Sequence, residues 1–302
     1  MKEYDYPVLT NFLDLSSVED NSEKYTNELA CLNGFLMASI NEDVGTGDIT
    51  TMACVPEDAV SKGFFIAKEP GVISGLGLLE RIFRLFDDSV CVTPHVCDGD
   101  DVKVGDIIAE ISGPSRVILT GERTALNLLQ HMSGIATKTA EAVREVSHTR
   151  TKILDTRKTT PGLRALDKYA VKCGGGTNHR FNLADGVLIK DNHIKTAGGI
   201  TNAVKNVRSN NPKKLQIEVE TENLEQVKEA LNAGADIIML DNMTPELMAE
   251  AVRLIGGQAL TEASGNMGER DLRTIAETGV DFISIGALTH SIKAMDISLK
   301  FE

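Results

Sequence analysis

The feature that most constrains the fold is a rhythm that repeats through the second half of the chain. An apolar run ends in polar or charged residues, a segment with helical spacing follows, and the cycle begins again. The apolar runs are KILDTRK (152–158), GVLIKDNH (186–193), LQIEVET (215–221), DIIMLDN (236–242), QALTEAS (258–264) and DFISIGA (281–287). Buried parallel strands that alternate with helices produce this pattern. It predicts an α/β barrel, with an open doubly wound sheet as the competing fold.

The first half has shorter strand-like runs and a different order of elements. Helical spacing predicts a helix over 27–40 and another over 75–86, and it predicts one long helix or two short ones over 121–146, broken near Ser133-Gly134. Residues 99–113 resemble a small β hairpin. A chain of 302 residues is long enough for two domains or for one barrel.

Composition excludes several classes of partner. A net charge of -13 argues against nucleic acids and anionic membranes, which attract basic proteins. Positive charge is nevertheless concentrated in residues 157–195, where eight Lys or Arg face three Asp. This segment is either a binding wall for a small anion or a solvated basic face.

Cysteine usage and hydropathy bear on the compartment. The five cysteines are odd in number and form no CxxC pair, which favours reduced thiols in a cytoplasmic protein. No apolar run reaches the roughly 18–20 residues of a membrane span, and the start of the sequence does not have the pattern of a secretory signal.

The polar residues at the strand ends are the candidate site. In such barrels the carboxyl ends of the strands and the following loops build the active site. Basic residues come from the early strands, acids from the middle ones, and Gly/Ser turns from the last, where backbone N–H groups can bind a phosphate. Neither GxGxxG after a strand nor GxxxxGK[ST] occurs, which excludes the usual Rossmann and P-loop sites.

Two glutamates on one predicted strand need a partner. In IEVE (217–220) the period-2 alternation places Glu218 and Glu220 on the same face, toward the barrel interior. Buried carboxylates are costly unless they bind something. Glu220, nearer the mouth, is the favoured ligand contact; the alternative is that both glutamates pair with lysines of neighbouring strands.

An ordered set of motifs resembles one known family. DTRKTTPGLR, GGGTNHR, LIKDNHI, IEVET, MLDN, EASGN and ISIGALTHS resemble quinolinate phosphoribosyltransferases, as do EDVGTGDITT, GVISGLGLLERIF and GERTALNLLQHMSGIA upstream. The resemblance covers roughly residues 27–300. It implies an N-terminal α/β sandwich domain and a seven-stranded α/β barrel of the type II phosphoribosyltransferases. The boundaries we predict are an extension over 1–26, a sandwich over 27–130 that can include the tail 290–302, and a catalytic barrel over 131–289.

The resemblance also implies an activity and a site. Family members transfer phosphoribosyl from phosphoribosyl pyrophosphate to quinolinate with Mg²⁺, releasing pyrophosphate and CO2 and giving nicotinate mononucleotide for NAD biosynthesis. The implied catalytic residues are Lys158, Lys190, Glu220 and Asp241. The implied substrate-binding residues are Arg123, Thr156, Arg157, Lys158, His179, Arg180, Lys190, Glu220, Asp241, Ser264, Gly265, Asn266, Ser284, Ile285, Gly286 and His290.

Within this set, Arg157, His179 and Arg180 are expected to hold the substrate carboxylates. Glu220 and Asp241 are expected to contact the ribose and, directly or through water, Mg²⁺. Arg123 matches an arginine that reaches the neighbouring subunit's site, so a dimer is the minimal unit of a homo-oligomer that is a dimer or a hexamer. The alternative for Arg123 is an exposed helix arginine beside Glu122.

Departures from the family pattern keep other activities open. Asn182 and Asn266 stand where family members often have Gly, while the charged positions are intact. The rivals are a paralogue linked to molybdenum transport, a nicotinate phosphoribosyltransferase that does not decarboxylate, and a non-catalytic phosphate-ligand binder. For His290 a purely structural role is an equal alternative, and Cys173 is expected to be a spectator.

Overall fold

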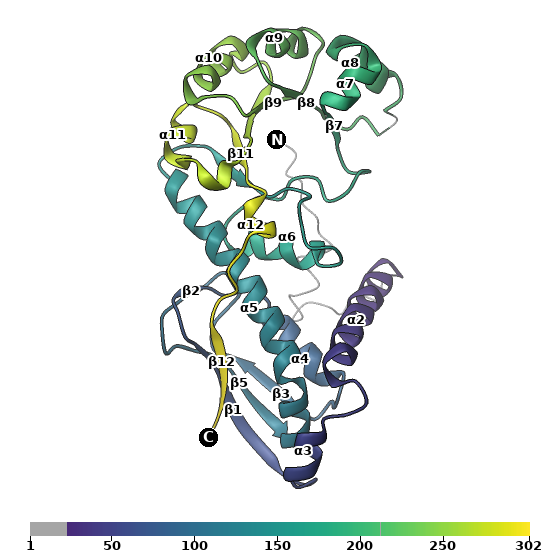
Figure 1. The fold of residues 1–302 in the computed structure, drawn as a ribbon, viewed down its shortest axis with the longest axis vertical. Helices are drawn as coiled ribbons and strands as arrows, with labels where there is room; N and C mark the ends of the chain where they lie inside the picture. Colours follow the sequence, from purple (N-terminus) through teal and green to yellow (C-terminus); the bar gives the residue numbers. More distant parts are fainter. Residues whose placement is uncertain (1–22, 212) are drawn as a thin grey trace. The chain divides into compact units, whose positions relative to one another are not determined.

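The apolar runs of the second half form one parallel sheet in the computed structural model, which describes residues 23–211 and 213–302 (Figure 1). The strands are β6 (Lys152–Leu154), β7 (Val187–Ile189), β8 (Ile217–Thr221), β9 (Ile237–Asp241), β10 (Leu260–Ser264) and β11 (Phe282–Ser284). Contacts divide the chain into two units, and this sheet belongs to the unit made of Thr139–Thr160 and Gly176–Ser291. We call it the barrel unit.

The strand order distinguishes a barrel from an open sheet. The order is β6-β11-β10-β9-β8-β7, so β7 to β11 follow one another in sequence and β6, the first strand, returns beside the last. Thr177 adds a parallel bridge to Leu154 of β6, at the place in sequence of one further strand. A doubly wound sheet would reverse its order at a switch point. The predicted α/β barrel is therefore confirmed, and the open sheet is wrong.

Helices follow the strands of the barrel unit. They are α7 (Asp191–Ala197), α8 (Ile200–Ser209), α9 (Leu224–Asn232), α10 (Pro245–Ile255), α11 (Leu272–Glu277) and α12 (Ala287–His290), with a 3-10 turn η2 (Met267–Glu269). The side chains of Asn223, Thr244 and Asp271 cap α9, α10 and α11 by accepting backbone N–H groups of the first turn. Strand β9 is buried over Ile237–Leu240, which is typical of barrel strands covered on both faces.

The other unit consists of the described part of residues 1–138 together with Pro161–Gly175 and Ile292–Glu302. Its main sheet is antiparallel in the order β12-β1-β5-β3, and a second sheet pairs β2 with β4. The strands are β1 (Val60–Ala67), β2 (Gly71–Val72), β3 (Cys91–Pro94), β4 (Asp101–Val102), β5 (Ile107–Pro114) and β12 (Ile297–Phe301). The helices are α2 (Glu23–Val44), α3 (Ile49–Cys54), α4 (Leu76–Arg84), α5 (Ser115–Val146) and α6 (Arg164–Cys173), with α5 continuing into the barrel unit.

One local expectation is wrong, and one that the sequence left open is decided by the structure. The predicted hairpin over 99–113 is wrong, because β4 pairs with β2 whereas β5 pairs with β1 and β3. The long helix is one piece, α5, and passes Ser133-Gly134 without a break. A side chain at Gly134 would collide with the backbone carbonyl of Lys293, so this glycine permits a close approach rather than ending the helix.

Other expectations fall partly outside the described residues. Residues 1–22 of the predicted extension lie outside them, and residues 23–26 begin α2. All five cysteines are free thiols, as expected. Among the described helices, none combines the length and the hydropathy that crossing a membrane would need.

Candidate active site

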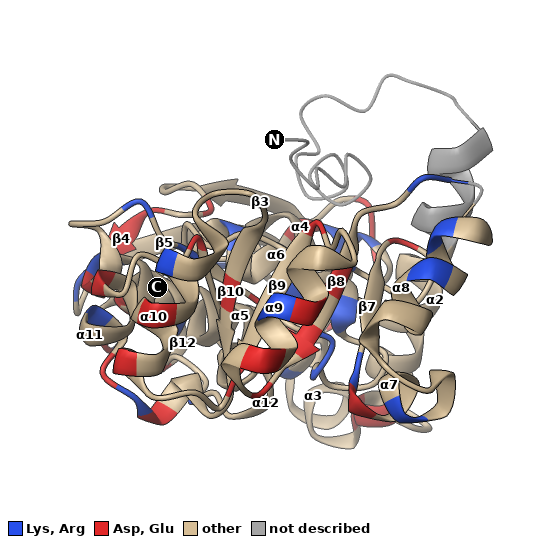
Figure 2. Ribbon diagram, turned by 90° about the horizontal axis from the view of Figure 1, so that it is seen from above, with Lys and Arg blue, Asp and Glu red and all other residues tan. Residues whose placement is uncertain are grey.

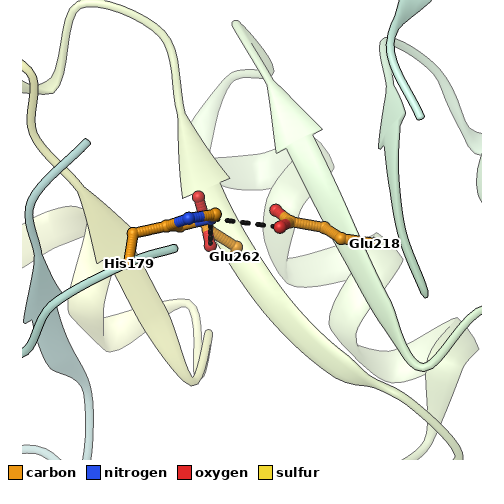
Figure 3. A group of neighbouring side chains, drawn as sticks. All are labelled: His179, Glu218 and Glu262. Atoms are coloured by element: carbon orange, nitrogen blue, oxygen red, sulfur yellow. Dashed lines mark hydrogen bonds and ion pairs between the residues drawn. The ribbon is translucent and has the colours of Figure 1, made fainter. Parts of the chain in front are cut away.

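A histidine and two glutamates from different parts of the barrel unit meet in its interior (Figure 3). Nε2 of His179 lies 3.1 Å from Oε2 of Glu218 on β8 and 3.6 Å from Oε2 of Glu262 on β10. In register, Glu218 stands opposite Ile237 and Glu262 opposite Met239 of the intervening β9, so the two glutamates share one face of the sheet. Acidic positions on β8 and β10 are also visible in Figure 2. We call these three residues the His–Glu cluster.

The His–Glu cluster is strongly coupled electrostatically. Burial lowers the pKa of His179, but the charges of Glu262 and Glu218 outweigh it and raise the pKa to about 10. Burial, together with the charge of Glu262, raises the pKa of Glu218 to about 7 against the opposing effect of His179. The backbone N–H of Arg180 donates to Nδ1 of His179 at 2.7 Å; this hydrogen bond needs a lone pair on Nδ1 and therefore opposes the second ring proton that the two carboxylates favour. In either state the proton on Nε2 faces the carboxylates.

The segment that carries His179 is fixed by a buried aspartate. Asp155 follows β6 and is fully buried; its carboxylate accepts the N–H of His179 at 2.8 Å and the side-chain amide of Asn178. The backbone N–H of Thr177 donates to the carbonyl of Ile153 on β6, and the N–H of Asp155 donates to the carbonyl of Thr177. These hydrogen bonds fix the backbone at the end of the glycine-rich stretch, and with it the positions of His179 and Arg180.

Arg180 and Arg157 form a cationic wall. Arg180 is buried, its Nη1 donates to the carbonyl of Gly186 at 2.9 Å, and its pKa is lowered by burial and then by the charge of Arg157. The two guanidinium groups are thus close enough to repel, an arrangement that an anion between them would relieve. A uniformly solvated basic face is excluded here, because Arg180 is only 9% exposed.

An acidic pair lies at the strand ends beside an exposed lysine. Nζ of Lys190 is 3.8 Å from Oε2 of Glu220. Burial raises the pKa of half-buried Glu220; Lys190 opposes this, and Asp241 at the end of β9 adds to it. The amide of Asn242 donates to Asp241 at 2.7 Å. For Glu220 the alternative of a lysine partner is therefore observed, whereas Glu218 pairs with a histidine.

The glycine turns bring Lys158 and His290 together. A Cβ at Gly286 would lie 2.9 Å from Cδ of Lys158 and 3.1 Å from Nε2 of His290, so only a glycine leaves both side chains in place. The hydroxyl of Thr289 donates to the carbonyl of Lys158 at 2.8 Å, which ties this loop to the start of α12. Lys158 and His290 are exposed.

The remaining expected residues take several positions. Thr156 is half-buried and accepts the N–H of Lys158 at 3.0 Å. Ser284 and Ile285 are buried, and the N–H of Ile285 donates to the carbonyl of Leu154. Ser264 ends β10, and Gly265 and Asn266 follow it with positive φ. Arg123 lies exposed on α5 in the other unit.

Glu262, Asp155 and Asn242 stand among the polar strand-end residues of the candidate site, but the sequence assigned them, and Asn178, no specific role. For Glu262 a signal was present, because the alternation in LTEAS puts it on the same face as Ser264. Asp155, Asn178 and Asn242 carry no such signal, since their contacts join segments that are distant in the sequence or depend on a turn.

These features define the class of protein: a parallel α/β barrel whose strand ends bring cations, carboxylates and glycine turns to an anionic substrate. The family comparisons are specific. The N-terminal domain of quinolinate phosphoribosyl transferase matches residues 48–133, and its C-terminal domain matches residues 135–300. The chain belongs to the quinolinate phosphoribosyltransferase family.

Individual relatives agree. The chain is 46% identical over 268 residues to the probable nicotinate-nucleotide pyrophosphorylase [carboxylating] of Bacillus subtilis (strain 168), covering 89% of this chain and 91% of the relative. The nicotinate-nucleotide pyrophosphorylase structure from Francisella tularensis superposes with a TM-score of 0.87 at 42% identity, covering 90% of this chain and 96% of the other. Human nicotinic acid phosphoribosyltransferase, at 13% identity and a TM-score of 0.61 over 88% of this chain and 73% of the other, shares the fold alone.

Proposed function

We propose that the protein transfers the phosphoribosyl group of phosphoribosyl pyrophosphate to quinolinate and decarboxylates the product, giving nicotinate mononucleotide, pyrophosphate and CO2. Membership of the family supports this activity. The observation that carries it is the juxtaposition of Arg157 with the buried Arg180 in the barrel unit, which suits a planar dicarboxylate.

Each wall of the site has a role in this proposal. Arg157 and Arg180 bind the quinolinate carboxylates, because guanidinium groups match carboxylates with two parallel hydrogen bonds. Lys158 and Lys190 supply positive charge toward the pyrophosphate that leaves. The turns at Gly265 and Gly286 offer backbone to the 5′-phosphate.

Glu220 and Asp241 fit a magnesium site of the kind that also uses substrate phosphates. The charge of Asp241 raises the pKa of Glu220, so the two carboxylates are close enough to gain from a shared cation. Mg²⁺ bound there would neutralise charge on the pyrophosphate. The same carboxylates face the ribose, where they stabilise the positive charge that develops at C1 as the bond to pyrophosphate breaks.

The decarboxylation needs no nucleophile from the protein. Once the ring nitrogen is glycosylated, the cationic pyridinium stabilises the carbanion that CO2 leaves behind. Cys173 is a spectator, since burial raises the pKa of its thiol to about 12 and keeps it protonated. The five free thiols of the chain are compatible with the reducing cytoplasm.

We also propose a homo-oligomer with a dimer as its minimal unit, in which Arg123 acts in the neighbouring site. Arg123 is exposed on α5 and therefore able to meet a partner. Mixing an Arg123→Ala chain with a chain inactivated in the barrel unit, such as Lys190→Ala, would test this. Hybrid dimers should regain activity in one of their two sites.

One assay tests the proposed reaction. The purified chain is incubated with Mg²⁺, phosphoribosyl pyrophosphate and either quinolinate or nicotinate, and nucleotide and CO2 are measured. We expect nucleotide and CO2 in equal amounts in the assay with quinolinate, and neither product in the assay with nicotinate. Turnover of nicotinate alone would instead indicate the non-decarboxylating activity of the same fold, and turnover of neither would indicate a binder or a transport-linked paralogue.

A further inference from the structure

We propose that Glu218 and Glu262 are positioning residues that hold the His179 ring, and through it the backbone of Arg180, in the arrangement that receives the substrate dicarboxylate. The identity of the ligand rests on the proposed function. The arrangement itself rests on the contacts of the His–Glu cluster.

The cluster is a costly structure that packing alone does not explain. Glu218 and Glu262 are 4% and 1% exposed, and among the described residues Oε1 of each is buried without a hydrogen-bond partner. A buried carboxylate oxygen left without a hydrogen-bond partner destabilises a fold, because it has lost its water and gained nothing in return. Two negative groups side by side add repulsion. Their shared neighbour is the Nε2 edge of His179, so the feature that both stabilise is the orientation of this ring.

The ring passes this orientation to Arg180. With Nε2 at the carboxylates, Nδ1 accepts the N–H of Arg180 at 2.7 Å. The guanidinium of the same residue donates to the carbonyl of Gly186 and is close enough to Glu218 for its charge to act on it. Both ring nitrogens are therefore engaged within the chain. In this proposal His179 contributes to carboxylate binding by fixing Arg180, in place of the direct contact with the substrate that the resemblance implies.

A metal site is the rival interpretation of the same three residues, since their ligand atoms lie within 4.8 Å of one another. Metal binding would need a lone pair on Nε2 of His179. The hydrogen bond from Arg180 uses the lone pair on Nδ1, which leaves the ring proton on Nε2. The tautomer thus favours a hydrogen bond to Glu218 over coordination of a cation.

Substrate kinetics separate positioning from a structural role. We expect Glu218→Ala to raise the KM for quinolinate about tenfold or more, with the KM for phosphoribosyl pyrophosphate changed less than about twofold, as for residues that orient a ligand-binding group. Glu218→Gln should restore part of the loss, because its amide oxygen still accepts the Nε2 proton. The KM of Glu262→Gln for quinolinate should lie between those of Glu218→Ala and Glu218→Gln. The control is Glu250→Gln, which removes one charge from an exposed position on α10 and should change neither KM.

One measurement on the wild-type chain does not depend on any variant folding, and a second compares the wild type with Glu262→Gln. Nitrogen-15 spectra of the histidine rings should show a hydrogen-bonded proton on Nε2 of His179, with His131, paired to Asp167 at 2.8 Å in the other unit, as internal reference. Calorimetry with Mn²⁺ or Zn²⁺ alone should show no binding that Glu262→Gln abolishes. A bare Nε2, metal binding lost in Glu262→Gln, or equal rises in both KM values would overturn the proposal. If the wild type neither binds nor turns over quinolinate, the proposed function fails, while the ring spectra still decide the positioning.

Discussion

Glu218 and Glu220 lie two residues apart on one face of β8, yet their surroundings differ in every respect that matters for chemistry. Glu218 is 4% exposed and shares a histidine with a second carboxylate. Glu220 is half-buried, with an exposed lysine on one side and Asp241 on the other. In our proposals, depth along the strand therefore separates two tasks: the interior carboxylate positions His179, and the carboxylate at the mouth meets the substrate.

The largest expected effect is at the mouth. Glu220→Ala and Asp241→Ala should each lower kcat/KM by about 10²–10³-fold, because they remove charge that stabilises the transition state. The free energy of unfolding should change little, since Glu220 is half-buried beside a lysine and Asp241 ends its strand. Steady-state kinetics and urea unfolding measure the two quantities. Full turnover in both variants would show that the acidic pair is not catalytic.

Two lysines of the same segment provide the next comparison. Lys190 contacts Glu220, whereas Lys195 is 75% exposed and pairs with Asp191 one turn earlier on α7. In the proposed function Lys190 also meets the pyrophosphate that leaves. A charge-assisted hydrogen bond to it contributes roughly 1.5–3 kcal/mol, so Lys190→Ala should lower kcat/KM by about 10- to 100-fold. The Lys195→Ala variant should stay within about twofold of wild type, because exposed ion pairs contribute little. Equal losses of kcat/KM in the two variants would show that the position of Lys190 beside Glu220 gives it no special part in the reaction.

The buried His–Glu cluster should make the free energy of unfolding depend on pH. The pKa of His179 is raised from 6.5 to about 10 by Glu262 and Glu218, against burial. A group whose folded pKa is raised stabilises the fold fully below its unfolded pKa and loses this contribution as pH rises through the folded value. The free energy of unfolding should therefore fall between pH 6.5 and about 10.

Glu262→Gln tests the origin of this fall. It removes the largest of the charges that raise the pKa of His179, so the decline between these pH values should be shallower than in wild type. Urea unfolding at several pH values measures it, with Glu250→Gln as the variant that should follow the wild-type curve. Identical slopes in Glu262→Gln and wild type would show that the His–Glu cluster does not cause this decline in the free energy of unfolding.

The fold was predictable from sequence because its signals are local and repeated. Six apolar runs of the second half became the six strands of the parallel sheet, and the alternation in IEVE placed Glu218 and Glu220 on one face. The pairing of β4 with β2 was not predictable, because hydrogen bonds between distant segments leave no periodicity. The sequence could not decide between one helix and two at Gly134 for the same reason, since this glycine serves the close approach of Lys293 from far along the chain.

The site was predictable by residue type and less so by role. The strand ends and the glycine loop indicated all five charged candidates, and the ordered motifs then implied their roles: Arg157, Arg180, Lys190, Glu220 and Asp241. The sequence did not indicate that the ring of His179 would be held at both nitrogens, because this depends on Glu262 arriving from β10. Roles that are set by depth and by cross-strand contacts need the three-dimensional arrangement.

The smallest effects are expected at the two asparagines that stand where relatives often have glycine. Asn266 has φ 51°, a conformation that costs most residues about 1–2 kcal/mol and glycine nothing, and its side chain makes no cap hydrogen bond. Asparagine adopts this conformation more readily than most residues, so Asn266→Gly gains only part of that relief. It also loses about 0.5–1 kcal/mol to the greater freedom of the unfolded chain, and the free energy of unfolding should therefore change by less than about 0.5 kcal/mol.

Asn182 should behave differently, although it is the same residue type in a loop of the same unit. Its Oδ1 accepts the N–H of Ala184 at 2.7 Å, and its own N–H donates to Asp185. Asn182→Gly removes the first of these bonds and should destabilise the fold by about 1 kcal/mol, and because this loop leads from Arg180 to β7 it should also raise the KM for quinolinate slightly. Urea midpoints of the two variants, measured side by side, decide the matter: equal shifts would show that backbone conformation, rather than the side-chain hydrogen bond, governs both loops.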